Sequence, residues 1–337
     1  MKYSGIDLHS NNSVVSVTDE ADRVVAEKRL PNDLPKILAF LSPWRVELAG
    51  VVVESTYNWY WLVDGLQAAG FTVHLANTTA IKKYDGLKHS GDETDARYLA
   101  QLLRLGILPT GTILPPEQRA MRDLARKRMQ LVRSRTSHIL AVENITGRQQ
   151  GTRLSCNQIR RLTTDAIGQM PLPADVALAI QANVAVITTL STQIDVLEKR
   201  LQQIVKPRAE YALLNTVPGI GQTLATTILL ETGPIERFAR AANFASYARC
   251  VDSQHTSNGK KKGEGNTRNG NKYLAWAFIE AANLALRYCA EAKQFYERKK
   301  VRTNSIVATK ALAHKLARAC FHILKEHKPF DVTRCFS

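Results

Sequence analysis

Two acidic residues stand three positions apart at the start of a predicted helix. Asp92 and Asp95 lie in the stretch 91–100, and the pattern predicts a helix that runs to about Leu105. This spacing places both carboxylates on one face of the helix, one turn apart, whereas Glu93 should point elsewhere. Acidic residues in a first helical turn also complement the helix dipole. A helix cap with a solvated face is therefore the alternative to a chemical role.

Two further carboxylates lie upstream, in apolar runs that are typical of strands. Asp7 falls on the first predicted strand, and Glu54 ends the apolar run 48–54. In open α/β sheets, ligands bind at the carboxyl ends of the strands. Phosphodiester cleavage or transfer uses two divalent ions about 4 Å apart, held by several carboxylates. We therefore expect a Mg²⁺ or Mn²⁺ site that works on phosphate, formed by Asp7, Glu54, Asp92 and Asp95.

A polar loop over residues 252–272 is rich in glycine, asparagine and basic residues, which suits close approach to a phosphate backbone. Ser257 in this loop is either a nucleophile or a hydrogen-bond donor to phosphate. The basic residues expected to contact nucleic acid there are Lys260, Lys261, Lys262, Arg268 and Lys272.

A second phosphate-binding candidate is the turn at residues 217–221, which precedes a predicted helix over 222–231. Gly219 and Gly221 free the backbone, and amides at a helix N-terminus bind phosphate without reading bases. The turn resembles the hairpin of helix-hairpin-helix modules. A tight turn between two helices with no ligand is the alternative.

The bulk composition favours a polyanionic partner. The 337 residues carry a formal net charge of +16, and a basic excess of this size favours nucleic acid over a membrane. A merely basic soluble protein is the alternative. The N-terminus lacks the apolar core of a signal peptide, and no uninterrupted apolar run approaches a membrane span, so we expect a cytoplasmic, nucleoid-associated protein. The five scattered cysteines predict buried small residues rather than disulfides or a zinc site.

The predicted elements give an α/β domain followed by helical sections. Three strands within residues 3–30 precede a helix, the strand 48–54, a helix, the strand 71–76, a short helix and the helix that begins at Asp92. This order predicts a mixed sheet with helices on its faces. We expect three domains: a mixed-sheet domain over 1–110, a helical coiled-coil region over 111–208, and a mainly helical domain over 209–337.

The middle region contains two long predicted helices, 117–145 and 173–205, with an interruption at 147–152. The first carries many arginines, among which Arg122 and Arg126 are candidates for binding nucleic acid. The second has apolar residues in alternating steps of four and three, which is a heptad seam with Asn183 inside it. The seam predicts a dimerising coiled coil. An intrachain hairpin with the 117–145 helix is the alternative.

The chain resembles the DEDD transposases of insertion sequences, the one-hundred-and-ten group that includes the Piv-type DNA invertases. Its N-terminal half resembles theirs in GIDLH, VVVESTYNWYWLVDGLQAAGFTVHLAN and GDETDARYLAQLLRLG. Its C-terminal part resembles their transposase domain in LLNTVPGIGQTLATTILLETGPIERF, the serine-bearing loop and GNTRNGNKYLAWAFIEAA. The motifs stand in the family's order and cover nearly the whole chain.

The resemblance implies an RNase H-like first domain, similar to the Holliday-junction resolvase RuvC. Asp7, Glu54, Asp92 and Asp95 match the family's magnesium-binding acids, and Ser257 matches its nucleophilic serine. The family is taken to form a phosphoserine link to DNA, with acids and serine contributed by different subunits. It also implies a noncoding bridge RNA that selects the element's donor ends and the target DNA, and dimers or tetramers joined partly through the coiled coil.

One position departs from the family pattern, because Asn258 stands where the family usually has glycine after the serine. Asparagine tolerates left-handed backbone, so we expect the loop to keep its shape. The attacking hydroxyl then rests between Ser257, Thr256 and Ser253. A metal-dependent junction nuclease that uses water, and an architectural nucleic-acid-binding protein, are the competing functions.

Overall fold

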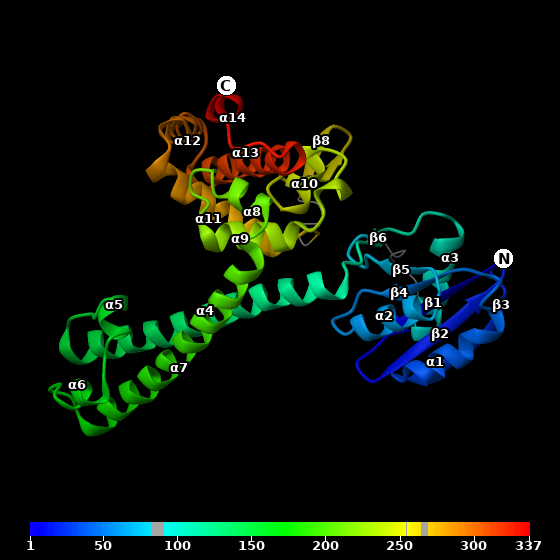
Figure 1. Cartoon of the computed structure of the whole chain (residues 1–337), viewed down its shortest axis with the longest axis horizontal. Coiled ribbons are helices and arrows are strands. Elements are labelled where there is room, and N and C mark those ends of the chain that lie inside the picture. The colour runs from blue at the N-terminus through cyan, green and yellow to red at the C-terminus, as the bar shows by residue number, and fades with distance from the viewer. Residues whose placement is uncertain (82–90, 254, 264–268) are drawn as a thin grey trace. The chain divides into compact units, whose positions relative to one another are not determined.

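The computed structural model describes residues 1–337 except 82–90, 254 and 264–268. The chain divides into two compact units, Met1–Pro116 and Glu117–Ser337, which we call the N-terminal and C-terminal units (Figure 1). The short helix predicted before Asp92 falls largely on residues outside the described ones.

A mixed sheet forms the centre of the N-terminal unit, as predicted. Its strand order is β3-β2-β1-β4-β5-β6. The first three strands pair antiparallel, β1 and β5 lie parallel to β4 on either side of it, and β6 closes the edge antiparallel to β5. The bounds are β1 (Lys2–Leu8), β2 (Asn12–Thr18), β3 (Val24–Pro31), β4 (Leu48–Glu54), β5 (Val73–Ala76) and β6 (Thr110–Gly111).

Helices cover both faces of this sheet. On one face α1 (Leu34–Leu41) and α2 (Tyr60–Ala68) pack over an apolar cluster that includes Ile6, Leu8 and Val53. On the other face α3 (Asp92–Arg104) packs over Val52 and Ala76 through Leu99. Because side chains alternate along a strand, the residues that face α3 are those between the ones in the larger cluster. The short 3-10 helix η1 (Ser42–Trp44) follows α1.

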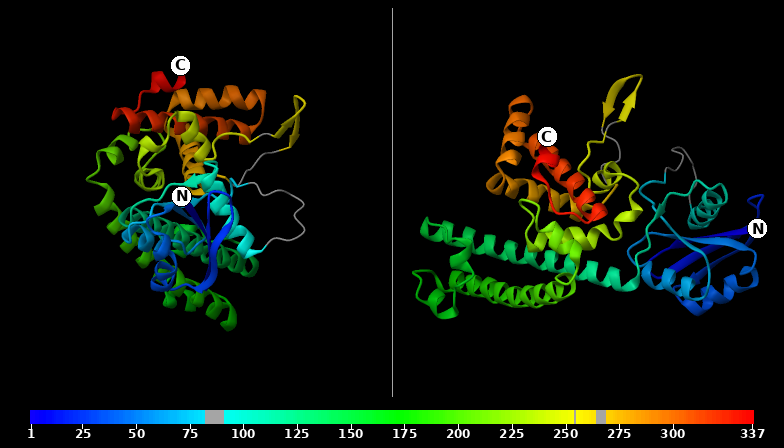
Figure 2. Two further views of the ribbon diagram at one scale, coloured as in Figure 1. Left: turned by 90° about the vertical axis from the view of Figure 1, so that its right-hand side faces the viewer. Right: turned by 45° about the horizontal axis from the view of Figure 1, so that its top comes forward.

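Two long helices lie side by side in the C-terminal unit, α4 (Pro116–Gln150) and α7 (Ala174–Val205), connected through α5 (Cys156–Ile159) and α6 (Thr164–Gly168) (Figure 2). The interruption predicted over 147–152 begins later than expected, because α4 continues to Gln150 and the chain leaves the helix at Gly151. The predicted heptad seam of α7 is buried or half-buried along most of its length. It packs on α4 of the same chain, where Ile180, Val184 and Ile187 meet Ile139 and Val142.

Polar contacts fix the pairing of these two helices. His138 Nδ1 lies 2.9 Å from Asn183 Oδ1, and Arg128 Nε donates to Glu198 at 2.8 Å. The structure thus has the intrachain hairpin, the second of the two arrangements that the seam allows. The exposed apolar residues of this pair include Leu140, Leu178, Val186 and Val196.

The helices after α7 surround one apolar cluster. They are α8 (Ala209–Leu214), α9 (Gln222–Thr232), α10 (Ala241–Tyr247), α11 (Lys272–Tyr288), α12 (Ala290–Arg302), α13 (Ser305–Glu326) and α14 (Val332–Phe336), with the 3-10 helix η2 (Ile235–Arg237). The cluster also contains Ala125, Leu201 and Val205 from the long helices. This cluster therefore crosses the boundary predicted at residue 208, while the α4–α7 pair also has a separate apolar cluster of its own.

Two further predictions about this unit need correction. One helix was predicted from Tyr273 to Tyr296, but the helix breaks at Cys289, whose backbone is extended and whose Sγ accepts a hydrogen bond from the amide of Ala292. The polar loop 252–272 contains a small hairpin, β7 (His255–Ser257) and β8 (Lys260–Gly263). This hairpin protrudes from the C-terminal unit (Figure 2, yellow).

Helix α7 also corrects the expectation that no segment approaches a membrane span. By length and composition alone it is apolar enough to cross a membrane, with a mean hydropathy of 1.4 over its most apolar stretch. Its polar contacts with α4 are those of a helix packed on protein. Among the cysteines, Cys250, Cys289 and Cys320 are buried as predicted, whereas Cys156 is exposed.

Candidate functional site

A glycine in β1 lets α3 pack directly on that strand. A Cβ atom at Gly5 would stand 1.9 Å from the carbonyl oxygen of Ala96 and 2.9 Å from the amide nitrogen of Ala100. Asp7 lies two residues farther along β1, so it is on the same face as Gly5. Only 4% of Asp7 is exposed. The strand therefore presents a buried carboxylate to the first turns of α3.

The register of the sheet brings Glu54 to the same level as Asp7. Ile6 pairs with Val53 in the parallel β1–β4 ladder, so Asp7 and Glu54 follow one residue beyond that pair. Glu54 shares its strand face with Val52, which packs against α3. It is half-buried at the end of β4. The expectation that Asp7 and Glu54 lie on neighbouring strands, with Glu54 at the carboxyl end of its strand, is confirmed.

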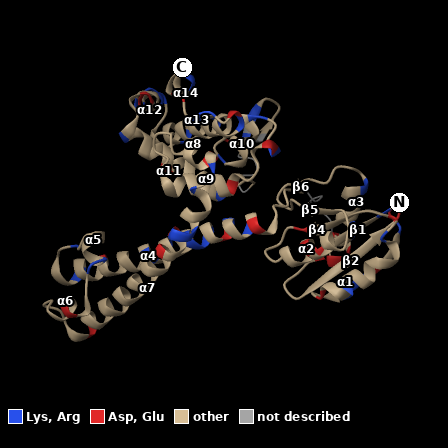
Figure 3. Ribbon diagram, in the orientation of Figure 1, with Lys and Arg blue, Asp and Glu red and all other residues tan. Residues whose placement is uncertain are grey.

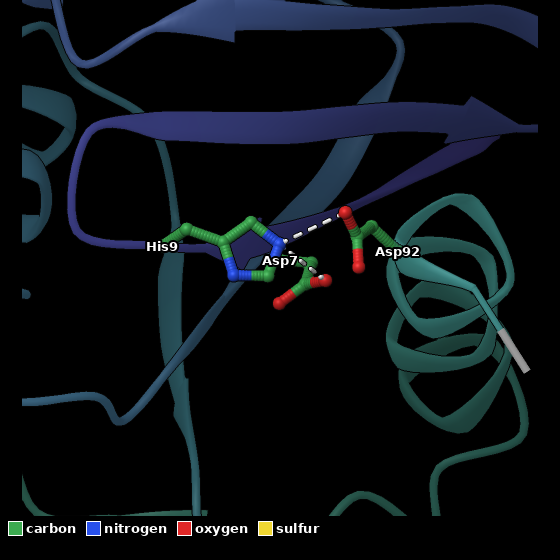
Figure 4. Close-up of side chains that lie close together, drawn as sticks. All are labelled: Asp7, His9 and Asp92. Carbon is green, nitrogen blue, oxygen red and sulfur yellow. Dashed lines mark ion pairs between the residues drawn. The ribbon is translucent and has the colours of Figure 1, made fainter.

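Asp7, His9 and Asp92 come together at this place (Figure 4). His9 Nε2 lies 3.3 Å from Asp7 Oδ2 and 3.2 Å from Asp92 Oδ2. The backbone carbonyl of His9 accepts hydrogen bonds from the side-chain amides of Asn32 and Asn58, at 3.0 Å and 2.9 Å. These two amides fix the turn after β1 and thereby fix the imidazole between the two carboxylates.

Arginine residues of the antiparallel strands and of α3 hold the helix against the sheet. Arg29 Nη2 on β3 donates to Asp92 Oδ2 at 2.6 Å, and this hydrogen bond lowers the pKa of Asp92. Farther along α3, Arg97 donates to Glu27 of β3, and Arg104 donates to Asp22 in the β2–β3 turn at 2.6 and 2.7 Å. Three ion pairs along one side of α3 thus align its first turn with β1.

The donor set of this cluster suits a divalent cation. Among the described residues, Asp7, His9 and Asp92 are the group whose ligand atoms all lie within 4.8 Å of one another. Carboxylate oxygens suit Mg²⁺ and Mn²⁺, whereas imidazole is more typical of transition metals. The cluster fits a divalent cation without selecting one. The guanidinium of Arg29 lies next to Asp92, so part of the negative charge of the cluster is already compensated by the protein.

The remaining predicted acids lie on the same side of the sheet but outside this group. Asp95 is half-buried one turn after Asp92, and Glu54 is half-buried at the end of β4. Glu93 is exposed and outside the cluster, but it does not point fully away, because its Oε1 lies 3.5 Å from Arg29 Nη2, the nitrogen that also contacts Asp92. Sequence reasoning missed His9 and Arg29. The available signal for His9 was its position two residues after Asp7, which allows both side chains to approach α3.

Ser257 is exposed and ends β7, directly before a two-residue turn. The turn residues Asn258 and Gly259 have φ values of 51° and 70°. Positive φ at both central positions is the geometry of the tight hairpin turns that favour Asn-Gly. The expectation that Asn258 tolerates a left-handed backbone is confirmed. The Asn-Gly pair was also the signal that predicts a hairpin here rather than an open loop.

The basic residues predicted around the serine differ in their exposure and in their contacts. Lys260, Lys262 and Lys272 are exposed, and Lys272 Nζ lies 5.3 Å from the centre of the Tyr273 ring. Lys261 pairs with Thr256 in the hairpin. Arg268 lies outside the described residues. Figure 3 shows basic residues along α4 and α12 and at the hairpin.

The two arginines of α4 that were predicted to bind nucleic acid are partly buried in the C-terminal unit. Arg126 donates two hydrogen bonds to Glu231 of α9, at 2.6 and 2.7 Å, and Glu231 is 2% exposed. Arg126 also stacks on the Tyr273 ring, 4.6 Å from its centre. Arg122 is half-buried. The charge of Arg126 is therefore committed inside the C-terminal unit.

The glycine turn before α9 has a packing reason of its own. Gly219 has φ of 86°, and a Cβ there would stand 2.3 Å from the carbonyl oxygen of Ala281 on α11. Gly219 thus allows the turn to lie directly on α11. This agrees with the alternative interpretation of a tight turn between two helices that binds no ligand. Gly221 is exposed at the N-terminus of α9 with open space around its Cα.

Comparisons with known proteins agree on one family. Residues 211–297 match the family model described as "Transposase IS116/IS110/IS902 family", and residues 4–145 match a transposase model of the DEDD type from the same group. Together the two matches span about two thirds of the chain.

Curated relatives match over nearly their full length. A probable family 20 transposase of Pseudomonas aeruginosa is 27% identical over 95% of this chain and 96% of its own. The transposase for insertion sequence element IS1111A of Coxiella burnetii is 21% identical over 98% of this chain and 88% of its own. The transposase for insertion sequence element IS1328 of Yersinia enterocolitica is 22% identical, over 97% and 98%.

Proposed function

The chain belongs to the DEDD transposases of the IS110 family, and from this premise we propose that it cuts and rejoins DNA through Ser257 and a divalent-metal site on an RNase H-like domain. The observation that carries the proposal is the cluster of Asp7, His9 and Asp92 at the first turn of α3. A buried carboxylate at the end of a central strand, aligned with a helix that brings a second one, is an arrangement suited to phosphate chemistry.

In the proposal, Asp7 and Asp92 hold Mg²⁺ or Mn²⁺, with Glu54 and Asp95 completing the ligands from the same side of the sheet. A cation bound there would neutralise charge on the scissile phosphate and favour ionisation of the attacking hydroxyl. His9 lies between the two carboxylates, at ion-pair distance from each, and in its protonated form it would keep them oriented toward each other. Arg29 donates a hydrogen bond to Asp92 and holds it in place.

Ser257 Oγ supplies the nucleophile. It loses its proton, forms a bond to phosphorus, and the backbone P–O bond on the opposite side breaks, with the leaving oxygen taking up a proton. The phosphoserine link conserves the energy of the broken bond, so a second DNA end can be joined without ATP. Lys260, Lys262 and Lys272 neutralise neighbouring phosphates, and Gly221 offers amides to the backbone.

The guide and the assembly extend the proposal. We infer from the family resemblance that a noncoding bridge RNA selects the element ends and the target, and that the basic surface of the chain binds it as well as DNA. Because the α7 seam packs on α4, a homodimer or homotetramer would form through the exposed apolar residues of the helical pair, including Leu178 and Val196. With these partners the protein would act in the cytoplasm, at the nucleoid.

The test is recombination between two plasmids in cells, with one plasmid carrying the complete element and the other its target. Ser257→Ala should abolish recombination and the covalent protein–DNA adduct. Thr256→Ala and Ser253→Ala are matched controls that should retain both. Normal recombination by Ser257→Ala would remove the nucleophile assignment. Free DNA ends without an adduct would favour a junction nuclease that uses water.

Asp7→Ala separates the enzyme from the architectural alternative. The substitution should abolish strand cleavage while leaving the affinity for DNA nearly unchanged, because Asp7 is buried and carries no positive charge. If Asp7→Ala left every activity of the protein intact, the acidic cluster would have no chemical role.

A further inference from the structure

The serine hairpin, residues 255–263, is a two-stranded sheet with Ser257 exposed at the end of its first strand. An isolated hairpin of this size is marginally stable in water. The direction in which Ser257 points therefore depends on how the loop that carries the hairpin is attached to the helices. This loop leaves α10 after Tyr247 and returns at Asn271, directly before α11.

The two ends of the loop are joined to each other. The amide of Asn271 donates to the carbonyl oxygen of Tyr247 at 2.6 Å. Gly270 has φ of 95°, and a Cβ there would stand 2.6 Å from that same carbonyl. A glycine is thus required for the close approach of the two chain segments. On the outgoing side, Asp252 forms an ion pair with Lys310 of α13.

The side chain of Asn271 connects this closure to the interior. Its Oδ1 accepts hydrogen bonds from the amides of Tyr273 and Leu274, which caps α11. Its Nδ2 donates to Glu231 Oε2 at 2.7 Å. The two backbone donors leave Asn271 one orientation, because a flipped amide would place its NH₂ against them. Asn271 is 7% exposed.

Glu231 is in turn held by Arg126, whose guanidinium donates to both carboxylate oxygens and stacks on Tyr273. A buried ion pair of this kind contributes little net stability but strongly resists any change in its geometry. We call Arg126, Glu231 and Asn271 the anchor cluster. It links three segments of the C-terminal unit, namely α4, the end of α9, and the returning end of the loop.

We propose that the anchor cluster is a positioning device for Ser257: it fixes the end of the serine loop so that the hairpin presents its hydroxyl in one direction. The inference rests on the proposed function of Ser257. None of the three residues touches DNA or the reacting atoms in this role. Their polar contacts tie the returning end of the loop, at Asn271, to the helical core.

The experiment moves the negative charge from one residue of the cluster to its neighbour. Asn271→Asp still caps α11, because a carboxylate accepts from the same two amides, but it loses the donor to Glu231 and places two carboxylates together. Glu231→Gln places an NH₂ group against the donors of Arg126 or Asn271. In the double variant, the new glutamine can donate to the new aspartate and accept from Arg126, and the total charge of the cluster is unchanged.

Two readouts are made on the full-length protein. Recombination and the covalent adduct are measured in the two-plasmid assay, and amide hydrogen exchange is measured on the purified protein in the segments 245–253 and 269–275. Each single variant should lower recombination by at least about tenfold, since a displacement of about 1 Å can cost about a hundredfold in rate. Exchange should rise in those two segments, and the double variant should recover most of both losses.

Asn304→Asp is the matched control, because Asn304 caps α13 through Val307 and lies outside the anchor cluster. It should leave both readouts unchanged. Wild-type exchange and recombination in Asn271→Asp, or a double variant no better than the worse single one, would overturn the inference. If Ser257→Ala recombines normally, the nucleophile assignment fails instead, and hydrogen exchange still decides whether the cluster anchors the loop.

Discussion

Gly5→Ala tests whether close packing of α3 on β1 creates the acidic cluster. The added Cβ would stand 1.9 Å from the Ala96 carbonyl oxygen, whereas ordinary contacts begin at 3.4 Å. The first turns of α3 must therefore move away by about 1.5 Å, or the strand must bend by a similar amount. His9 Nε2 now lies 3.2 Å from Asp92 Oδ2, so a shift of that size would break the contact.

Overpacking of this kind costs about 1–3 kcal/mol of stability, and a misplacement of about 1 Å can cost about a hundredfold in rate. We expect Gly5→Ala to remain folded, with weaker Mn²⁺ binding and recombination lowered by roughly a hundredfold. Urea unfolding measures the stability, calorimetry with Mn²⁺ measures the site, and the two-plasmid assay measures the activity.

Gly111→Ala is the matched control in the same sheet. A Cβ at Gly111 would meet its nearest neighbour, Leu75, at 3.6 Å, which is ordinary contact. This variant should bind Mn²⁺ and recombine like the unaltered chain. If Gly5→Ala also kept wild-type metal affinity and activity, the contact between β1 and α3 would not be what sets the geometry of the acids.

Three further sets of substitutions test other parts of the structure. Lys262→Ala should reduce the slope of log DNA affinity against log salt concentration by about one phosphate contact. Arg126→Ala should leave that slope unchanged and instead lower the stability of the fold by about 3–5 kcal/mol, because it removes the positive partner of a buried carboxylate. Equal slopes for both variants would contradict this. Asn258→Gly should retain recombination and Asn258→Val should lose it, since a β-branched residue resists positive φ; an active valine variant would show that the turn is not needed. A hydrogen bond from Arg334 lowers the pKa of Glu326 to about 2, below its ordinary value of 4.5, so the pair stabilises the fold above pH 4.5 and this contribution is lost as the pH falls toward 2. Glu326→Gln should flatten the fall of stability over that range in urea unfolding, and an unchanged pH profile would contradict the assignment.

The sequence predicts the N-terminal unit well because its signals are local. The apolar run that ends at Glu54 and the alternation around Asp7 specify strands, and the β–α order specifies a mixed sheet. The approach of Asp7 to Asp92 follows from Gly5 and from three ion pairs that join distant segments. No periodicity reports such contacts, so the sequence indicates the acids but not the geometry that unites them.

In the C-terminal unit, the sequence patterns do not predict which segments pack against one another. A heptad seam predicts that one side of α7 is buried, but it does not say which helix covers it, and the structure places α4 there. The basic character of Arg126 suggests that it binds nucleic acid, yet it forms an ion pair with Glu231, 105 residues later in the chain. The helix break at Cys289 has no proline or glycine beside it to announce it, and the structure marks it by the Cys289 side chain, which accepts a hydrogen bond from the amide of Ala292.

The occupied seam of α7 has a consequence for how the protein assembles. A helix whose apolar stripe is covered only by a second chain folds as that chain binds, and its stability then rises with protein concentration. Here the stripe is covered within one chain, so a single copy can complete its own core. Folding and association are thus two separate equilibria. A monomer should therefore unfold at a denaturant concentration that does not change when the protein is diluted.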